Sequence, residues 1–499
     1  MELIQQILAG VIGSGLIAIL AWLLKKYVTW KKFDKFISTI DFPRRGLARR
    51  INSEAFLKWQ DKILKDIYGQ DHFTQIFNME YPVYCIDFER ENYDIDEVDS
   101  LCKDKNNKLL ITYDKRTVNA KGRVTLPNIY NTDIMTQSVE TNQRLSHKEK
   151  ALKKSLMGNG WWWKGYLWFT ARSMRDGNHI GYILDHIDQE DEKIKKIHLS
   201  VGSYKLNLLT SHILTYEMFK AYEKLQKKGI DTNNVKLEEL WPMLPFRRYI
   251  HHVNNNDINK VLYTGKGRYA LLSVQCLVML CTTEYGCPEY KTFLLKRSDN
   301  TRDVSTKLGC YQFPPSGGFD LYDEEYLQDK ETIRSNCSLS LALMREYLEE
   351  IFNDNSYAKV DKSNNLKGTA TIELVNLDKR TQEIREMLKT PLIDNRFKPG
   401  TQQAFFTSVG TNIDLIDLRL SVNFLLVIND YNYYKNHIKE FSYNEEFGNT
   451  TGKMLREWDS ISDILEGERK IVEDSVAVYA QGKKVFEKYI SNTIAPTPL

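Results

Sequence analysis

The chain has 499 residues, 42% hydrophobic and 27% charged, a composition typical of globular proteins that excludes a disordered or low-complexity chain. The whole chain has 69 basic and 66 acidic side chains, and nine of the basic and three of the acidic ones lie in the first fifty residues. The residues after position 50 are therefore slightly acidic in sum, which argues against binding to duplex DNA or RNA. Seven cysteines without a CxxC pair indicate reduced thiols, and neither disulfides nor a zinc site.

The N-terminal residues have the pattern of a membrane-spanning helix. From Leu3 to Leu24 the polar side chains are limited to Gln5, Gln6 and Ser14. A helix of this length extends about 33 Å, enough to cross a hydrocarbon core of about 30 Å. Basic residues follow the run, so the positive-inside rule places the body of the chain in the cytoplasm. We therefore predict a single-pass span over residues 1–26, the lipid bilayer as a partner and a location in the cell inner membrane; a cleaved signal peptide is the alternative.

The segments after the span alternate between helical and strand patterns. Residues 27–78 are typical of a basic helical connector, and residues 79–245 are typical of a middle α+β domain with polar turns. An aromatic cluster at Trp161–Phe169 fits a buried strand, and the apolar periodicity from Asp191 to Lys228 predicts helices. The short strands of this region are expected at Val83–Phe88, Leu109–Tyr113 and Arg123–Leu126.

The C-terminal half, residues 246–499, has the pattern of a mixed sheet between helices. Apolar runs at Tyr269–Cys281 and Tyr290–Leu295 are separated by a short turn and predict a hairpin. The whole chain is therefore predicted to be an α/β (α+β) protein with one N-terminal transmembrane helix. Three more strands and a final amphipathic helix are expected at Thr369–Leu374, Ala404–Val409, Ser421–Ile428 and Ile471–Tyr489.

A cluster of carboxylates marks the candidate site in this half. Wound as a helix, the segment Arg345 to Glu350 places three glutamates on one face, while apolar residues gather on the opposite face. Hard cations prefer oxygen ligands, so Glu346, Glu349 and Glu350 are candidate ligands for Mg²⁺ or Mn²⁺. The alternative is the solvated face of an amphipathic helix rich in glutamate.

This helix and the residues before it resemble the Nudix box, in which a glycine-led loop precedes a helix carrying Arg-Glu and, two residues later, Glu-Glu. Gly317 and Gly318 match the loop, and Glu324 falls six residues later, as in the box. The resemblance implies that water attacks a diphosphate linkage, with glutamates holding the metal and the arginine orienting a glutamate. It implies catalytic roles for Arg345 and Glu346, metal ligation by Glu346, Glu349 and Glu350, and nucleotide binding by Gly317 and Gly318.

Two basic residues close to this loop are further candidates for nucleotide binding. Lys296 and Arg297 come at the end of the second strand of the predicted hairpin. In a Nudix-like domain this position suits cations that face a pocket. The alternative is that they protect the edge of a strand from aggregation.

The combination of an N-terminal span with a Nudix-like half resembles the transmembrane-Nudix effectors of cyclic-oligonucleotide-based antiphage signalling systems (CBASS). The resemblance implies a sensor that binds a cyclic nucleotide, assembles as a homo-oligomer and disrupts the inner membrane. A membrane-anchored Mg²⁺-dependent hydrolase of nucleoside diphosphate derivatives is the alternative. Phe352 stands where the box has its closing glycine, and extra residues separate Glu324 from Arg345. Both differences favour recognition over catalysis.

Overall fold

The computed structural model describes a large part of the chain from Gly46 onward. The predicted span over residues 1–26, the predicted strand at Thr369–Leu374 and Glu324 lie outside the described residues. The chain divides into two compact units, Met1–Arg50 and Ile51–Leu499, and the elements below belong to the second. Described are residues 46–90, 93–112, 123–125, 166, 170, 180–284, 288–297, 307–321, 327–329, 333–334, 337–354, 375–390, 403–442 and 455–491. Within these ranges, no helix combines the length and the apolar character needed to cross a bilayer.

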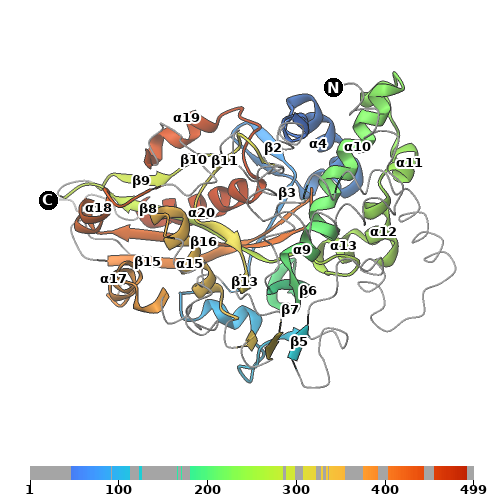
Figure 1. The fold of residues 1–499 in the computed structure, drawn as a ribbon. Coiled ribbons are helices and arrows are strands. Elements are labelled where there is room, and N and C mark those ends of the chain that lie inside the picture. The colour runs from blue at the N-terminus through green and yellow to red at the C-terminus, as the bar shows by residue number, and fades with distance from the viewer. Residues whose placement is uncertain are drawn as a thin grey trace, which may run out of the picture. The chain divides into compact units, whose positions relative to one another are not determined.

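The largest sheet has seven strands of mixed orientation (Figure 1). Its order is β17-β9-β8-β16-β15-β3, and β12 pairs with β8. Strand β8 runs parallel to β16, whereas the other pairs are antiparallel. Strands β8 and β16 are buried along their whole length, which explains their continuous apolar sequences. The strands are β3 (Val83–Ile86), β8 (Ser273–Cys281), β9 (Tyr290–Phe293), β12 (Ser316–Gly318), β15 (Gln403–Asp414), β16 (Leu420–Asn429) and β17 (Leu455–Glu457).

Helices pack against this sheet and enclose its core. Helix α20 (Glu473–Ser491) contacts β3, β8, β15 and β16, whereas α15 (Leu339–Phe352) contacts β8 and β12. Helix α17 (Lys379–Leu388) contacts β15, and helix α18 (Tyr431–His437) contacts β8. Leu277 and Met279 of β8 belong to the core under α20, and they alternate with side chains that point to the opposite face of the sheet. The predicted hairpin, the strands near residues 404 and 421 and the final helix are confirmed.

A second sheet of four strands is built on a long hairpin. Strands β6 (Ile180–Glu190) and β7 (Lys193–Ser203) pair antiparallel, with β13 (Asp320–Leu321) beside β6 and β4 (Ile111–Thr112) beside β7. The predicted helix from Asp191 is therefore wrong up to Ser203. Asp191 and Glu192 have φ of 49° and 62°, the left-handed conformation of a two-residue hairpin turn. Helix begins at Tyr204, with α9 (Tyr204–Asn207), a π-helical turn at Leu208–His212 and α10 (Ile213–Lys227).

The remaining described elements surround these two sheets. Tyr166, the described member of the aromatic cluster, is helical, so the predicted strand is wrong at this residue. Its side chain is buried, as predicted, and donates a hydrogen bond to the carbonyl of Leu208. The predicted strands near residues 83, 109 and 123 are confirmed with shorter bounds. Helices α4 (Glu54–Tyr68), α11 (Leu237–Leu240), α12 (Pro245–Val253), α13 (Ile258–Tyr263) and α19 (Ile461–Leu465) accompany the strand pairs β1 (Thr74–Ile76) with β2 (Met79–Tyr81), β10 (Leu295–Lys296) with β11 (Tyr311–Gln312), and β5 (Arg123–Thr125) with β14 (Leu327–Asp329).

The chain is thus a mixed α and β protein with helices and several sheets, as its sequence predicts at this level. Strand β3 comes from the predicted middle domain, yet it pairs with β15 of the C-terminal half. Arg469 and Asp61 form an ion pair through two hydrogen bonds of 2.6 and 2.7 Å between α4 and the C-terminal segment. Segments on either side of the predicted boundary at residue 245 therefore share one sheet and one network of contacts.

Candidate functional site

Helix α15, which carries the candidate carboxylates, is fixed at both ends. At its start, the Ser338 side chain accepts a hydrogen bond from the Leu341 N–H (3.1 Å), and Asp99 accepts one from the Leu339 N–H (2.7 Å). These contacts satisfy backbone donors that a helix N-terminus leaves unpaired. The helix includes Phe352 and is closed by Asn353, whose φ of 52° is left-handed. The Nudix box has its closing glycine at the position of Phe352. In this chain the left-handed residue that ends the helix comes one position later and is an asparagine.

The candidate side chains of α15 are buried. Arg345, Glu346, Glu349 and Glu350 are 4 to 8% exposed. The alternative prediction of a solvated helix face is therefore wrong. Charged groups are rarely placed in such surroundings, because removal from water costs several kcal/mol per ion unless other groups compensate it.

The guanidinium of Arg345 connects two of these carboxylates with the neighbouring strand. Its Nη2 donates to Glu346 Oε1 at 2.8 Å and to the carbonyl oxygen of Gly318 at 3.0 Å. Its Nε lies 3.8 Å from Glu349 Oε1. Arg345 therefore orients Glu346, the contact that the Nudix resemblance implies, and ties α15 to β12.

Strand β12 accepts α15 at close range because it contains glycine. A Cβ atom on Gly317 would lie 1.9 Å from Glu346 Cδ and 2.1 to 2.2 Å from its two carboxylate oxygens. One residue earlier, the backbone N–H of Ser316 donates to Glu350 Oε2 at 2.6 Å. The structure thus brings together Gly317, Gly318, Arg345 and the three glutamates, which the sequence places about thirty residues apart.

The arrangement offers hard oxygen ligands but not a closed metal cage. When ionised, the four side chains of α15 sum to a charge of −2, from three carboxylates and one guanidinium. The carboxylate oxygens of the three glutamates do not all lie within 4.8 Å of one another. Among the described residues, one group of metal-binding side chains meets that condition, and it lies elsewhere. Mg²⁺ commonly takes one or two carboxylates and completes its octahedron with water and substrate phosphates. The donor set fits that partial mode of binding.

The two predicted basic residues lie on β10 and just after it. Lys296 places its ammonium 4.7 Å from the centre of the Tyr311 ring, and Arg297 donates to Gln312 Oε1 at 2.7 Å. Both partners belong to β11. The structure therefore places Lys296 and Arg297 beside the strand that precedes β12, and their described side-chain contacts are with β11.

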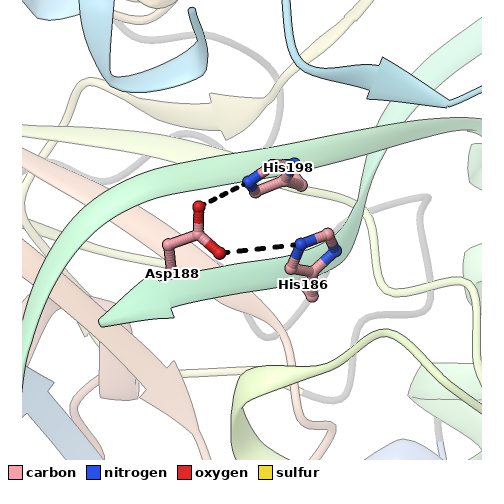
Figure 2. A group of neighbouring side chains, drawn as sticks. All are labelled: His186, Asp188 and His198. Atoms are coloured by element: carbon pink, nitrogen blue, oxygen red, sulfur yellow. Dashed lines mark hydrogen bonds and ion pairs between the residues drawn. The ribbon is translucent and has the colours of Figure 1, made fainter. Parts of the chain in front are cut away.

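A second cluster, which the sequence did not predict, lies on the hairpin of β6 and β7 (Figure 2). Within the described residues, His186, Asp188 and His198 are the one set of metal-binding side chain types with ligand atoms all within 4.8 Å of one another. His186 and His198 are directly opposite across the strands. His186 and Asp188 are two residues apart, a spacing that places both side chains on one face of a strand. Because a helix was expected from Asp191, the strand that carries His198 was not predicted.

The chain was also compared with known proteins, and no family model and no curated protein matches it. A function for the chain therefore has to rest on the geometry of its own residues.

Proposed function

We propose that this chain is a membrane-anchored nucleotide sensor, the effector of a cyclic-oligonucleotide-based antiphage signalling system. A cyclic nucleotide binds beside β12 and α15, and the bound copies assemble into a homo-oligomer. Assembly gathers the predicted N-terminal spans and disrupts the inner membrane. The observation that carries the proposal is the burial of Arg345, Glu346, Glu349 and Glu350 against a glycine-containing strand.

The order of elements supports a Nudix-like interpretation of residues 246–499. Along the chain come β8, β9, the glycine-containing strand β12, the carboxylate helix α15, the strands β15 and β16, and the final helix α20. Helices α15 and α20 both contact β8, the central strand of the mixed sheet. This is the order that the Nudix box resemblance leads one to expect.

The charge of the cluster supports a metal-bridged ligand. A divalent cation would bring the summed charge of the four α15 side chains from −2 to zero, and nucleotide phosphates would complete its coordination. A ligand that binds only the assembled state, at a hundred times its dissociation constant, shifts the assembly equilibrium by about 2.7 kcal/mol. This is enough to change the oligomer population strongly.

A membrane-anchored Mg²⁺-dependent hydrolase of nucleoside diphosphate derivatives is the second candidate. The observation that favours it is the 2.8 Å contact between Arg345 and Glu346, which matches the catalytic role that the resemblance implies for this pair. In that case the metal would polarise the phosphates and lower the pKa of an attacking water.

One experiment separates the two candidates. The purified full chain is incubated in detergent with Mg²⁺ and a panel of cyclic mono-, di- and trinucleotides and linear nucleoside diphosphate derivatives. Chromatography follows product formation, and light scattering follows molecular mass. Assembly on an intact cyclic nucleotide supports the sensor, whereas hydrolysis of a linear diphosphate without assembly contradicts it and supports the hydrolase.

Variants connect either result to α15. Glu349→Gln keeps the size of the side chain but removes its charge, so it is expected to weaken the Mg²⁺-dependent response by tenfold or more. Glu386→Gln is the matched control, because Glu386 lies on α17 and pairs with the exposed Lys389. If the two variants responded equally to nucleotide and Mg²⁺, Glu349 of α15 would not take part in binding, and the proposed site would be wrong.

A further inference from the structure

The hairpin of β6 and β7 presents two imidazoles and a carboxylate to the same point (Figure 2). His186 and His198 are stacked, with ring centroids 3.8 Å apart and planes at 16°. Asp188 lies between their Nε2 atoms: its Oδ2 is 2.8 Å from His198 Nε2, and its Oδ1 is 3.7 Å from His186 Nε2. Three potential ligand atoms therefore converge from two adjacent strands.

A neighbouring carboxylate is placed to orient one of the imidazoles. Asp185 Oδ2 lies 3.3 Å from His186 Nδ1, within reach of a hydrogen bond from Nδ1–H. Thr112 of β4 in turn donates to the same oxygen at 3.4 Å. With the proton on Nδ1, His186 Nε2 has the lone pair, the arrangement by which proteins commonly fix a metal-binding histidine.

The ligand atoms of the cluster lie close enough together for small movements to form a metal site. Zinc binds imidazole nitrogen and carboxylate oxygen at about 2.0 to 2.2 Å, which sets neighbouring ligand atoms about 3.3 Å apart. One ligand atom from each of the three residues lies within 4.8 Å of the others. The two short separations run to different oxygens of Asp188, so a small rotation of its half-exposed carboxylate would bring one oxygen toward both imidazoles.

A lysine opposite Asp188 has a partner of its own. Lys196 is directly opposite Asp188 across the strands, where its ammonium would compete with a cation. Its Nζ instead donates to the carbonyl oxygen of Ser100 at 2.8 Å. The carboxylate of Asp188 therefore remains directed at the two histidines.

We propose that His186, Asp188 and His198 bind a divalent late transition metal ion, for which Zn²⁺ is the probe. Two imidazoles and one carboxylate suit such ions, whereas Mg²⁺ and Ca²⁺ prefer oxygen alone. Asp185 acts as a positioning residue through His186. The site is separate from the carboxylates of α15 in both its residues and its choice of metal, and it does not depend on the proposed function.

Metal binding would stabilise the part of the fold that supports β12. His186 and His198 lie on opposite strands, so one ion would connect β6 to β7. Strand β6 also pairs with β13, which follows β12 directly, and the N–H of Tyr182 donates to the carbonyl of Phe319 between them. The ion would therefore stabilise the hairpin that pairs with β13, the strand that comes directly after Gly318.

Binding is tested by titrating Zn²⁺ into the chelator-treated full chain, with calorimetry as the readout. We expect one ion per chain, and no comparable heat with Mg²⁺ at this site. His198→Ala removes a ligand and is expected to weaken Zn²⁺ binding by more than tenfold, and Asp185→Asn by about 10 to 100-fold. His252→Ala is the matched control, because His252 lies on α12 and is expected to leave the affinity unchanged.

X-ray absorption on the wild-type complex gives a second measurement that does not depend on the folding of any variant. The proposal predicts nitrogen and oxygen neighbours at about 2.0 to 2.2 Å, with the scattering pattern of imidazole. Sulfur neighbours at about 2.3 Å would assign the ion to cysteines and overturn the proposal. A wild-type chain that retains no Zn²⁺, or a folded His198→Ala chain that binds it equally well, would overturn it too.

Discussion

Gly317 controls how closely the carboxylate of Glu346 approaches β12. Alanine at this position would place its Cβ about 2 Å from that carboxylate, so Glu346 or the strand must move. Overpacking of this kind costs about 1 to 3 kcal/mol. We therefore expect Gly317→Ala to lower the free energy of unfolding by that amount, measured by urea denaturation, and to weaken the Mg²⁺-dependent nucleotide response.

Gly46→Ala is the control for this change. Gly46 lies in a helical turn, and a Cβ atom there would have no neighbour within 4 Å. Alanine is the better helix former, so this variant is expected to be unchanged or slightly more stable. If both alanine variants behaved alike, the close contact between Gly317 and Glu346 would not matter for the fold.

His251 gives the chain a specific sensitivity to acid. Burial lowers its pKa from 6.5 to about 3, with Arg247 and Arg268 as the neighbouring positive charges. Between these two values the unfolded state binds a proton that the folded state does not, so the free energy of unfolding falls as pH falls. The slope of this contribution reaches about 1.4 kcal/mol per pH unit.

His251→Gln removes this titration and keeps a polar side chain of similar length. We expect its urea midpoint to change less than that of the wild type between pH 6.5 and pH 4.5, because all other titrating groups are shared. Parallel curves for the two proteins would show that the His251 pKa is not lowered in the folded state.

At the scale of single residues, spacing along the sequence predicts a common face only for residues of one element. Glu346, Glu349 and Glu350 are neighbours on one helix, so their spacing alone predicts their common face. Their burial is a property of β12 and the surrounding core, which the spacing does not encode. His198 joins His186 only through the pairing of two strands, and the sequence pattern predicts a helix for the second of them.

Among the elements, α15 depends on caps at its first turn. Ser338 accepts from the Leu341 N–H, and removal of such a cap typically costs about 1 kcal/mol. Ser338→Ala is therefore expected to lower the urea midpoint by a corresponding amount. Ser338→Thr keeps the acceptor oxygen and should retain most of the stability. A full loss with threonine would mean that packing, and not the hydrogen bond, is what alanine disturbs.

The long apolar elements could be predicted because their patterns are consistent over many residues. Strands β8 and β16 are buried on both faces and have continuous apolar sequences, and α20 keeps one apolar face over nineteen residues. The prediction of a helix over β7 was wrong because the strand contains an extra residue, Lys195, at a register shift. This leaves Ile194 and Ile197 both buried at helical spacing. The turn is defined by the positive φ angles of Asp191 and Glu192. Glycine at these positions would have predicted such angles from the sequence, but aspartate and glutamate do not.

In the unit formed by residues 51–499, the pair between Arg469 and Asp61 joins α4 to the C-terminal segment. Arg469 is 6% exposed and lies 3.7 Å from Glu473 as well. Arg469→Met would remove the cation that pairs with Asp61, whereas Glu473 would keep Lys307; breaking a buried pair in this way typically costs about 3 to 5 kcal/mol. We expect that loss in urea denaturation, together with faster amide exchange in α4.

The double variant Asp61→Leu with Arg469→Met tests the cause. It removes one buried charge from each side, so it should be more stable than Arg469→Met alone. Equal stability of the single and double variants would show that the lost packing of the arginine stem accounts for the effect.

The pairing of β3 with β15 sets a condition on how the chain is made. Ile86 meets Thr411, so the strand at residues 83–86 waits for more than three hundred further residues before its partner exists. At about 5 to 20 residues per second, this delay is about 15 to 65 seconds of synthesis. During that time Val83 and Ile86 lack their final cover, so chaperones that hold nascent chains are expected to engage this protein early. The same long separation between contacting residues predicts slow refolding from denaturant.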